Sequence, residues 1–407
     1  MKILCVFGEH NYGDPSRGQG YEYSNFLPAF RRLGHEVVFF ESFDRSRYRD
    51  FPDLNRQLLE AVEREDPDVV FCVLMGYEVW LETIALAQRA CRARWINWAT
   101  DDSWKYAEFS RFVAPGFDLY VTTSASALRR AEAAGLHNVA LSQWAANAEC
   151  YAAPLPAGEC RYPVSFVGSA YGNRPKWIAG LKARGIAVSC FGHGWEGGPV
   201  AAGEIPRIIR ASVISLNFGD SGVVWNGLLP HRSRQIKARI FEVPGAGGFL
   251  LTEPAERLDE YYKPGEEMEL FHNLEELVQK IEHYLAHPEQ RDRIAHAGHA
   301  RTVAAHSYDM RFAQLLALAV AQQPACASPP PCAVGPNEFA GIAARHRPTP
   351  LLRLLRWLLV TPCVLLWGHR RGRRAARRIL FELSWRLLGR HTYTAGGWPG
   401  RLFYAES

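Results

Sequence analysis

The feature that most constrains the fold is a repeated alternation of short apolar runs with longer stretches of helical pattern. In the first 150 residues, six such runs are nearly continuous in apolar side chains, which is typical of parallel strands buried on both faces. Helical patterns at residues 26–33 and 54–64 lie between them, which predicts a doubly wound sheet. The predicted strands are residues 3–7, 36–40, 68–74, 94–98, 119–123 and 139–141.

A second set of the same kind begins near Pro163, after a segment at residues 151–162 in which Pro, Ala and Gly cluster. The predicted strands are residues 164–167, 187–191, 213–218, 249–251 and 268–271. The predicted helices are residues 176–184, 205–211, 235–244, 274–285, 288–299 and 309–321. The sequence therefore predicts two Rossmann-like domains, residues 1–155 and 156–323, with a cleft where they face each other.

Composition places the chain among globular proteins, with 48% hydrophobic and 22% charged residues. Nine cysteines occur without a CxxC pair, and several stand inside apolar runs, which favours a reducing cytoplasm over a disulfide framework or a zinc site. The N-terminal MKILCVFGEH is interpreted as a first strand, so we expect no signal peptide. We accordingly expect a cytoplasmic protein.

The charge is concentrated near the C-terminus, after a Pro-rich linker at residues 324–350. Twelve arginines and one acid lie between Arg345 and His391, giving 12 − 1 = +11, so the remainder of the +5 chain sums to 5 − 11 = −6. Such a localised basic block indicates an anionic partner.

The tail, residues 351–407, begins with LLRLLRWLLVTPCVLLW. Its uncharged core, residues 357–368, is shorter than the roughly 20 residues that span a bilayer, and Pro362 is expected to bend it. Apolar residues on one helical side among arginines predict a basic amphipathic helix, peripheral at the anionic inner face of the membrane. A helical hairpin packed on the body and a disordered tail are alternatives. The aliphatic surroundings of the arginines argue against nucleic acid as a partner.

Loops that follow strands carry the ligand sites of open α/β sheets, and QIKARIFEVPGAGGFLLTE holds the clearest set of polar residues. Arg239 and Glu242 are three apart and share a helix face with Lys237 nearby, so a cation could meet a diphosphate and a carboxylate a ribose. Gly247 and Gly248 would let backbone approach a ligand. The alternative is a surface ion pair followed by a plain turn.

This segment and its continuation, through Thr-Glu, Tyr-Tyr-Lys-Pro-Gly and paired helices ending at His-Ser-Tyr, resemble the donor-domain half of group 1 glycosyltransferases, with the CgeB-like branch closest. The resemblance covers residues 163–316 well and the first 150 residues only as a general Rossmann pattern. It implies a GT-B fold and a nucleotide-sugar donor of UDP or GDP type held by the second domain. It matches Glu242 to the ribose-binding glutamate, Arg239 to the basic position facing the diphosphate, and Gly247 and Gly248 to the glycines past the helix.

One position departs from the family pattern. Many group 1 enzymes carry a second glutamate eight residues before the ribose-binding one, and here that position is Arg234. The departure leaves open the donor sugar and the stereochemical course. It also leaves open a non-catalytic nucleotide-sugar or partner-binding protein on the same fold, or another GT-B enzyme such as a sugar-nucleotide epimerase.

Other candidate donor residues follow strands of the second domain. Gly168 and Ser169 come directly after one strand, and Arg174 opens the next helix, where free N–H groups and a cation favour phosphate. Asn217 ends another strand and could contact base or sugar. The alternatives are a capped turn with exposed cations and an asparagine that satisfies loop backbone.

Candidate catalytic residues follow strands of the first domain. His10 lies in a glycine-rich loop after the first strand, and Asp101 and Asp102 follow the fourth. An ionised aspartate in hydrogen-bond reach could act as general base on an acceptor hydroxyl, whereas helix N-capping is the alternative. The resemblance implies that side chains and helix dipoles neutralise the donor, so no metal and no cofactor is expected. Together these features predict a metal-independent glycosyltransferase acting on a glycan, lipid-linked or protein acceptor.

Overall fold

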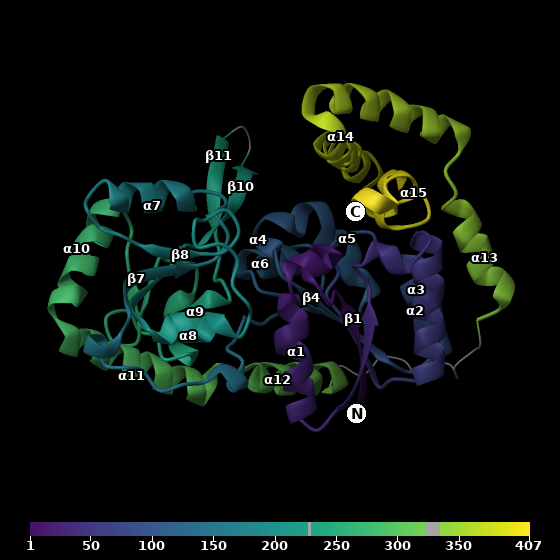
Figure 1. Ribbon diagram of the computed structural model, residues 1–407. Coiled ribbons are helices and arrows are strands. Elements are labelled where there is room, and N and C mark those ends of the chain that lie inside the picture. The colour runs from purple at the N-terminus through teal and green to yellow at the C-terminus, as the bar shows by residue number, and fades with distance from the viewer. Residues whose placement is uncertain (227–228, 322–333) are drawn as a thin grey trace. The chain divides into compact units, whose positions relative to one another are not determined.

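The computed structural model describes residues 1–226, 229–321 and 334–407, which form two compact units. Unit 1 comprises Met1–Thr122, Leu128–Ala140 and Leu316–Ser407, and unit 2 comprises Thr123–Ala127 and Leu141–Leu315. Each unit is built on its own parallel sheet with helices around it (Figure 1). The predicted α/β class with two Rossmann-like parts is therefore confirmed.

Unit 1 has a six-stranded sheet in the order β2-β1-β3-β4-β5-β6. All six predicted strands are present, and the pairs from β2 through β5 are parallel. Side chains of β1, β3 and β5 are almost wholly buried, which explains their continuous apolar sequences. The strands are β1 (Lys2–Phe7), β2 (Glu36–Glu41), β3 (Val69–Cys72), β4 (Arg94–Ala99), β5 (Leu119–Thr122) and β6 (Val139–Leu141).

Helices cover both faces of this sheet, with α1 on one face and α2 and α3 on the other (Figure 1). Asp50 caps α2 by accepting a hydrogen bond from the backbone N–H of Asp53 at 2.9 Å, and Leu54, Leu58 and Val62 form its buried stripe. The helices are α1 (Tyr21–Arg32), α2 (Phe51–Glu65), α3 (Leu81–Ala90), α4 (Asp102–Lys105), α5 (Arg111–Val113) and α6 (Ala125–Ala133).

Unit 2 has a five-stranded sheet in the order β13-β12-β9-β7-β8, and all its pairs are parallel. Each of the five predicted strands is confirmed. An antiparallel hairpin, β10–β11, was not predicted. The strands are β7 (Tyr162–Val167), β8 (Ser189–Phe191), β9 (Ser212–Asn217), β10 (Asp220–Asn226), β11 (Leu229–Arg234), β12 (Leu250–Thr252) and β13 (Glu269–Leu270).

The helices of unit 2 also lie in two layers, with α7 and α10 on one face of the sheet and α8 and α9 on the other (Figure 1). Four of the six predicted helices agree closely with the structure, whereas the one expected from residue 235 begins only at Arg239 and the one expected to end at residue 299 continues to Ala305. The helices are α7 (Arg174–Lys182), α8 (Glu204–Arg210), α9 (Arg239–Gly245), α10 (Leu274–Ala286), α11 (Pro288–Ala305) and α12 (Tyr308–Ala321).

The C-terminal segment packs on unit 1. It forms α13 (Pro336–Arg345), α14 (Pro350–Leu388) and α15 (Trp398–Leu402), so part of the segment expected to be a linker is helical. Residues 324–333 of that predicted linker lie outside the described residues. The Glu108 carboxylate accepts a hydrogen bond from Arg378 at 2.9 Å, and the Tyr393 hydroxyl donates to the Glu108 carbonyl. These contacts join the tail to unit 1.

The unit boundaries differ from those predicted, because some segments pack on the other unit from the one that precedes them in sequence. Residues 141–155 belong to unit 2: the Ala146 N–H donates to the His306 carbonyl at 2.9 Å, and the Ala152 N–H donates to the Gly245 carbonyl at 3.2 Å. At the other end, α12 begins in unit 2 and ends in unit 1. The polypeptide therefore passes between the units more than once.

Candidate functional site

The strand order locates the ligand edge of each sheet. Numbered within its own sheet, each unit has the order 2-1-3-4-5, and unit 1 adds a sixth strand. In such sheets ligands bind beyond the carboxyl ends of the strands, at the point between strands 1 and 3 where the direction of winding reverses. That point lies after β7 and β9 in unit 2 and after β1 and β3 in unit 1.

Arg174 lies beside the loop after β7 and is 8% exposed. Its Nη1 donates to the Ser169 carbonyl at 3.0 Å, and its Nη2 donates to the Tyr171 hydroxyl at 3.1 Å. Its Nε is buried and has no hydrogen-bond partner among the described residues. Burial lowers the pKa of Arg174, and the charge of Arg239 lowers it further. A ligand anion at this point would therefore be strongly stabilised.

Two carboxylates line the same edge after β9 and β12. Asp220 accepts hydrogen bonds from the Asn173 N–H at 3.1 Å and from Arg232 at 2.6 Å. Glu253 is 1% exposed; one of its oxygens accepts from the Gly219 N–H at 2.9 Å. Its other oxygen is 3.3 Å from Arg234, the residue that replaces the family's first glutamate. Burial raises the pKa of Glu253, and Arg234 opposes that rise.

Helix α9 carries the predicted acidic and basic pair close to the end of β11. Arg239 Nη1 is 2.7 Å from Glu242 Oε2, and both side chains are 19% exposed. Lys237 lies just before the helix and is partly buried. Gly168 and Ser169 lie against the Arg174 guanidinium in the loop after β7. The charge of Arg239, at the start of α9, lowers the pKa of Arg174.

The remaining predicted donor residues have partners inside the protein. Asn217 donates its amide hydrogen to Thr252 Oγ1 at 2.9 Å and is buried. Gly247 and Gly248 precede β12, so they lie toward its amino end, away from the ligand edge. A Cβ on Gly247 would lie 2.5 Å from the Ala152 carbonyl oxygen, and one on Gly248 would lie 2.6 Å from Ile209. This arrangement argues for a packing role for both glycines rather than the predicted donor contact.

In unit 1, the adjacent aspartates after β4 have different surroundings. Asp102 is 2% exposed, accepts a hydrogen bond from the Ser110 hydroxyl, and has its pKa raised by burial to about 6. Asp101 is partly exposed and precedes α4, and its side chain makes no capping hydrogen bond. N-capping by the Asp101 side chain, the structural alternative, is therefore not observed. Of the two, Asp101 is the carboxylate that an acceptor could reach.

Two further charged residues near Asp101 were not singled out from the sequence. Burial raises the pKa of Glu22 to about 7, and the charge of Asp101 raises it further. Burial also lowers the pKa of Lys105, which donates a hydrogen bond to the Met75 carbonyl. His10, in the loop after β1, forms a β-bridge with Gln19. The sequence signal for Glu22 was its position directly after the glycine-rich loop that ends at Gly20.

The second half of the chain matches a known protein family, and the whole fold matches solved structures. Residues 174–317 match the model of a family described as "Glycosyl transferase-like". The structure of Anabaena Alr3699/HepE in complex with UDP and glucose aligns with a TM-score of 0.54 at 14% identity over 78% of this chain and 100% of that one. The chain has the GT-B fold. The family match and this fold together support a glycosyltransferase, as the sequence predicted.

Other GT-B structures align over a similar share of the chain. Sucrose-phosphate synthase from Thermosynechococcus elongatus gives a TM-score of 0.57 at 11% identity over 79% of this chain and 100% of that one. The lipopolysaccharide outer core galactosyltransferase WaaB, in its apo form, gives 0.50 at 13% identity over 78% and 99%. No curated protein matches the chain significantly. The CgeB-like branch stays a prediction.

Proposed function

We propose that the chain transfers a sugar from a UDP- or GDP-type donor, held at the carboxyl edge of the unit 2 sheet, to a hydroxyl of a glycan, lipid-linked or protein acceptor. The observation that carries this proposal is Arg174: a buried guanidinium with an unpartnered Nε at the strand-order reversal, electrostatically coupled to Arg239. A diphosphate would supply an anion for the buried Arg174 and would compete with Glu242 for Arg239. The CgeB-like resemblance supports the same assignment.

The residues have distinct proposed roles. Arg174, Arg239 and Lys237 neutralise the diphosphate, which removes the need for a metal ion, and Glu242 accepts hydrogen bonds from the ribose hydroxyls. Glu253 lies 3.3 Å from Arg234 at the same edge. Its carboxylate takes the place of the family's first glutamate, which this chain replaces with Arg234. Ser169 and the backbone after Gly168 provide further polar groups near the phosphates.

We assign the general base to Asp101. It would take the proton from the acceptor hydroxyl as that oxygen attacks the anomeric carbon and the bond to the nucleoside diphosphate breaks. Glu22 acts as its electrostatic neighbour, and Lys105 supplies a cation nearby. Asp102 is buried against Ser110 and orders the start of α4 instead.

A donor panel tests this proposal. Purified protein is screened by thermal shift with UDP- and GDP-sugars, because a bound donor raises stability by RT ln(1 + [L]/Kd), about 2.7 kcal/mol at a hundredfold excess over Kd. The stabilising donors are then incubated with acceptor extracts, with and without a metal chelator. Equal sugar transfer in both conditions is expected, and loss of transfer with the chelator would refute metal independence.

A second candidate function is a non-catalytic nucleotide-sugar-binding protein. It is favoured by one observation, the replacement of the family's first glutamate by Arg234. Stabilisation by a donor without any sugar transfer would support this alternative.

A further inference from the structure

Helix α14 is broken at Gly368, whose φ of 77° and ψ of 168° turn the chain sharply. The second half, residues 369–388, buries Ala376, Leu380 and Phe381. The first half, residues 350–367, folds back on it and buries Cys363 with Ala376 and Leu380 in one apolar cluster. The tail is therefore a helical hairpin, one of the alternatives considered from sequence, and its bend lies at Gly368 rather than at Pro362.

The outer face of the first half has no protein cover in the described part of the chain. Leu351, Leu354, Leu358 and Leu365 are spaced by three, four and seven residues, so they lie along one side of the helix. Their exposed fractions are 74%, 52%, 53% and 81%. Trp357 and Trp367 are also more than half exposed. An apolar stripe of this kind on a protein surface marks an interaction site.

The charges around this stripe favour an anionic partner. Ten arginines and no acidic residue occur between Phe339 and Phe381. Arg353, Arg370, Arg371 and Arg374 are exposed and form no ion pair with any carboxylate among the described residues. Cations at both ends of an apolar stripe that also carries tryptophans are typical of helices that lie in the interface of an anionic bilayer.

The packing of the hairpin favours a helix lying along the bilayer surface over one crossing it. An 18-residue stretch within Pro350–Tyr393 is apolar enough to cross a membrane by length and composition alone, and 6% of it is buried. Its inner face, however, carries Arg356, which donates to Glu406 at 2.7 Å and to the Leu402 carbonyl at 2.9 Å. If this helix crossed a bilayer, Arg356 would lose its contact with Glu406 and its charge would lie among acyl chains, which is unfavourable.

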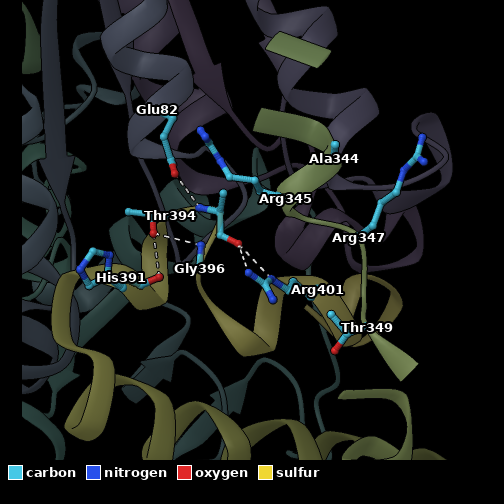
Figure 2. A pocket seen from close by; sticks show the side chains of 10 residues that line it. Glu82, Ala344, Arg345, Arg347, Thr349, His391, Thr394, Gly396 and Arg401 are labelled. Carbon is cyan, nitrogen blue, oxygen red and sulfur yellow. Dashed lines mark hydrogen bonds between the residues drawn. The ribbon is translucent and has the colours of Figure 1, made fainter. Parts of the chain in front are cut away.

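A basic pocket of about 480 Å³ opens at the start of this helix. Figure 2 shows three arginines around it, Arg345, Arg347 and Arg401, with Glu82 as the single carboxylate. Thr349, which caps α14, also lines it, so the pocket adjoins the exposed Leu351. Glu82 is already engaged by the Ala395 N–H at 2.7 Å. The lining thus carries an excess of positive charge next to an apolar surface.

We propose that this pocket binds the phosphate of an anionic lipid headgroup while the adjacent leucine stripe of α14 lies among the acyl chains of the same leaflet. The protein then sits at the membrane surface with α14 parallel to it. Burial lowers the pKa of Arg401, and a phosphate beside it would stabilise its charged form. The site is independent of donor binding, which the proposed function places in unit 2.

Vesicle co-sedimentation of the full chain tests the proposal. Phosphatidylcholine vesicles are compared with vesicles that also contain phosphatidylglycerol, and binding is expected only to the second kind. The pocket variant R345Q/R347Q should weaken binding about 30-fold, since each cation near an anionic surface contributes about fivefold. The stripe variant L358D/L365D should weaken it at least about tenfold. Added salt should weaken binding of the unaltered protein only in part, because salt screens the arginines but not the leucine stripe.

Matched controls replace exposed residues of unit 2. R207Q on α8 and L285D on α10 should bind the anionic vesicles as the unaltered protein does. Far-ultraviolet circular dichroism and donor-induced thermal shift check that every variant is folded. Equal binding to both kinds of vesicle, or full binding by R345Q/R347Q, would overturn the headgroup site. Full binding by L358D/L365D would overturn the role of the stripe, and resistance to alkaline carbonate extraction would show a crossing helix instead.

Discussion

Arg239 and Glu242 face each other across one turn of α9, with Nη1 2.7 Å from Oε2. Both residues were predicted to bind the donor, and their opposite charges lie in contact with each other. The sequence left open whether these residues form an i,i+3 ion pair or bind the donor. The two interpretations are compatible, because a bound donor would separate the pair and contact each side chain. The pair places a cation and a carboxylate close to the ligand edge of unit 2.

Removing the Arg239 charge should weaken donor binding. Arg239→Gln eliminates one of two coupled cations at the diphosphate, and a hydrogen bond to a charged group contributes about 1.5–3 kcal/mol. We expect the Kd of the donor to rise about 10–100-fold by isothermal titration calorimetry. The control is Arg184→Gln, because Arg184, in the turn after α7, also pairs with a glutamate, Glu275 of α10, at 2.6 Å. Equal affinities for both variants would contradict the assignment.

Asp101 and Asp102 should differ in their effect on catalysis. Asp101→Asn removes the proposed general base and should lower kcat about 10²–10⁴-fold, with little change in the Kd of the donor. Asp102→Asn keeps the oxygen that accepts from Ser110 and should change kcat only a few-fold. Steady-state kinetics of the two variants measure this difference. A larger loss in Asp102→Asn than in Asp101→Asn would reverse the assignment.

Asp102 should also make stability depend on pH. Burial raises its pKa to about 6 in the folded protein, above the value in the unfolded chain, so folding favours the protonated form. The contribution of Asp102 is full below a pH of about 4 and is lost as pH rises through about 6. Asp102→Asn should therefore be up to about 3 kcal/mol more stable than the unaltered protein at pH 8. Urea unfolding at pH 5 and pH 8 measures this gain, which should be smaller at pH 5.

Arg291 should be the most sensitive basic residue of α11. It is fully buried, and its guanidinium donates to the carbonyls of Val213, Ser212 and Leu155 at 2.7, 2.8 and 2.9 Å. Arg291→Leu removes these three hydrogen bonds from a charged donor and should cost about 3–5 kcal/mol of unfolding free energy. Arg293, two residues later, is exposed, and Arg293→Leu should change stability by no more than about 0.5 kcal/mol. Comparable losses in the two variants would show that the Arg291 network contributes little.

The same two arginines show what the sequence could and could not predict. The strands of both sheets are buried on both faces and therefore have continuous apolar sequences. These sequences allowed all eleven of them to be predicted. Nothing in the local sequence distinguishes Arg291 from Arg293, because only the tertiary fold brings the three carbonyls to the first. The hairpin β10–β11 was missed because its strands are rich in polar residues.

The site was predicted in part for similar reasons. Arg174, Ser169, Arg239 and Glu242 follow strands or begin helices, and position relative to a parallel strand can be inferred from sequence. The packing of Gly247 against residues 152–154 depends on a distant segment and could not be inferred. Nor could the difference in burial between Asp101 and Asp102, which depends on Ser110 and on the packing beneath α4.

The most direct test of the account is nucleotide release by the unaltered protein and by Glu242→Ala. Both are incubated with the donor found by thermal shift and with an acceptor extract, and free nucleoside diphosphate is measured over time. The unaltered protein and the control Glu275→Ala should release nucleotide, and Glu242→Ala should release it at a rate at least about 100-fold lower. Unchanged release by Glu242→Ala would contradict the account.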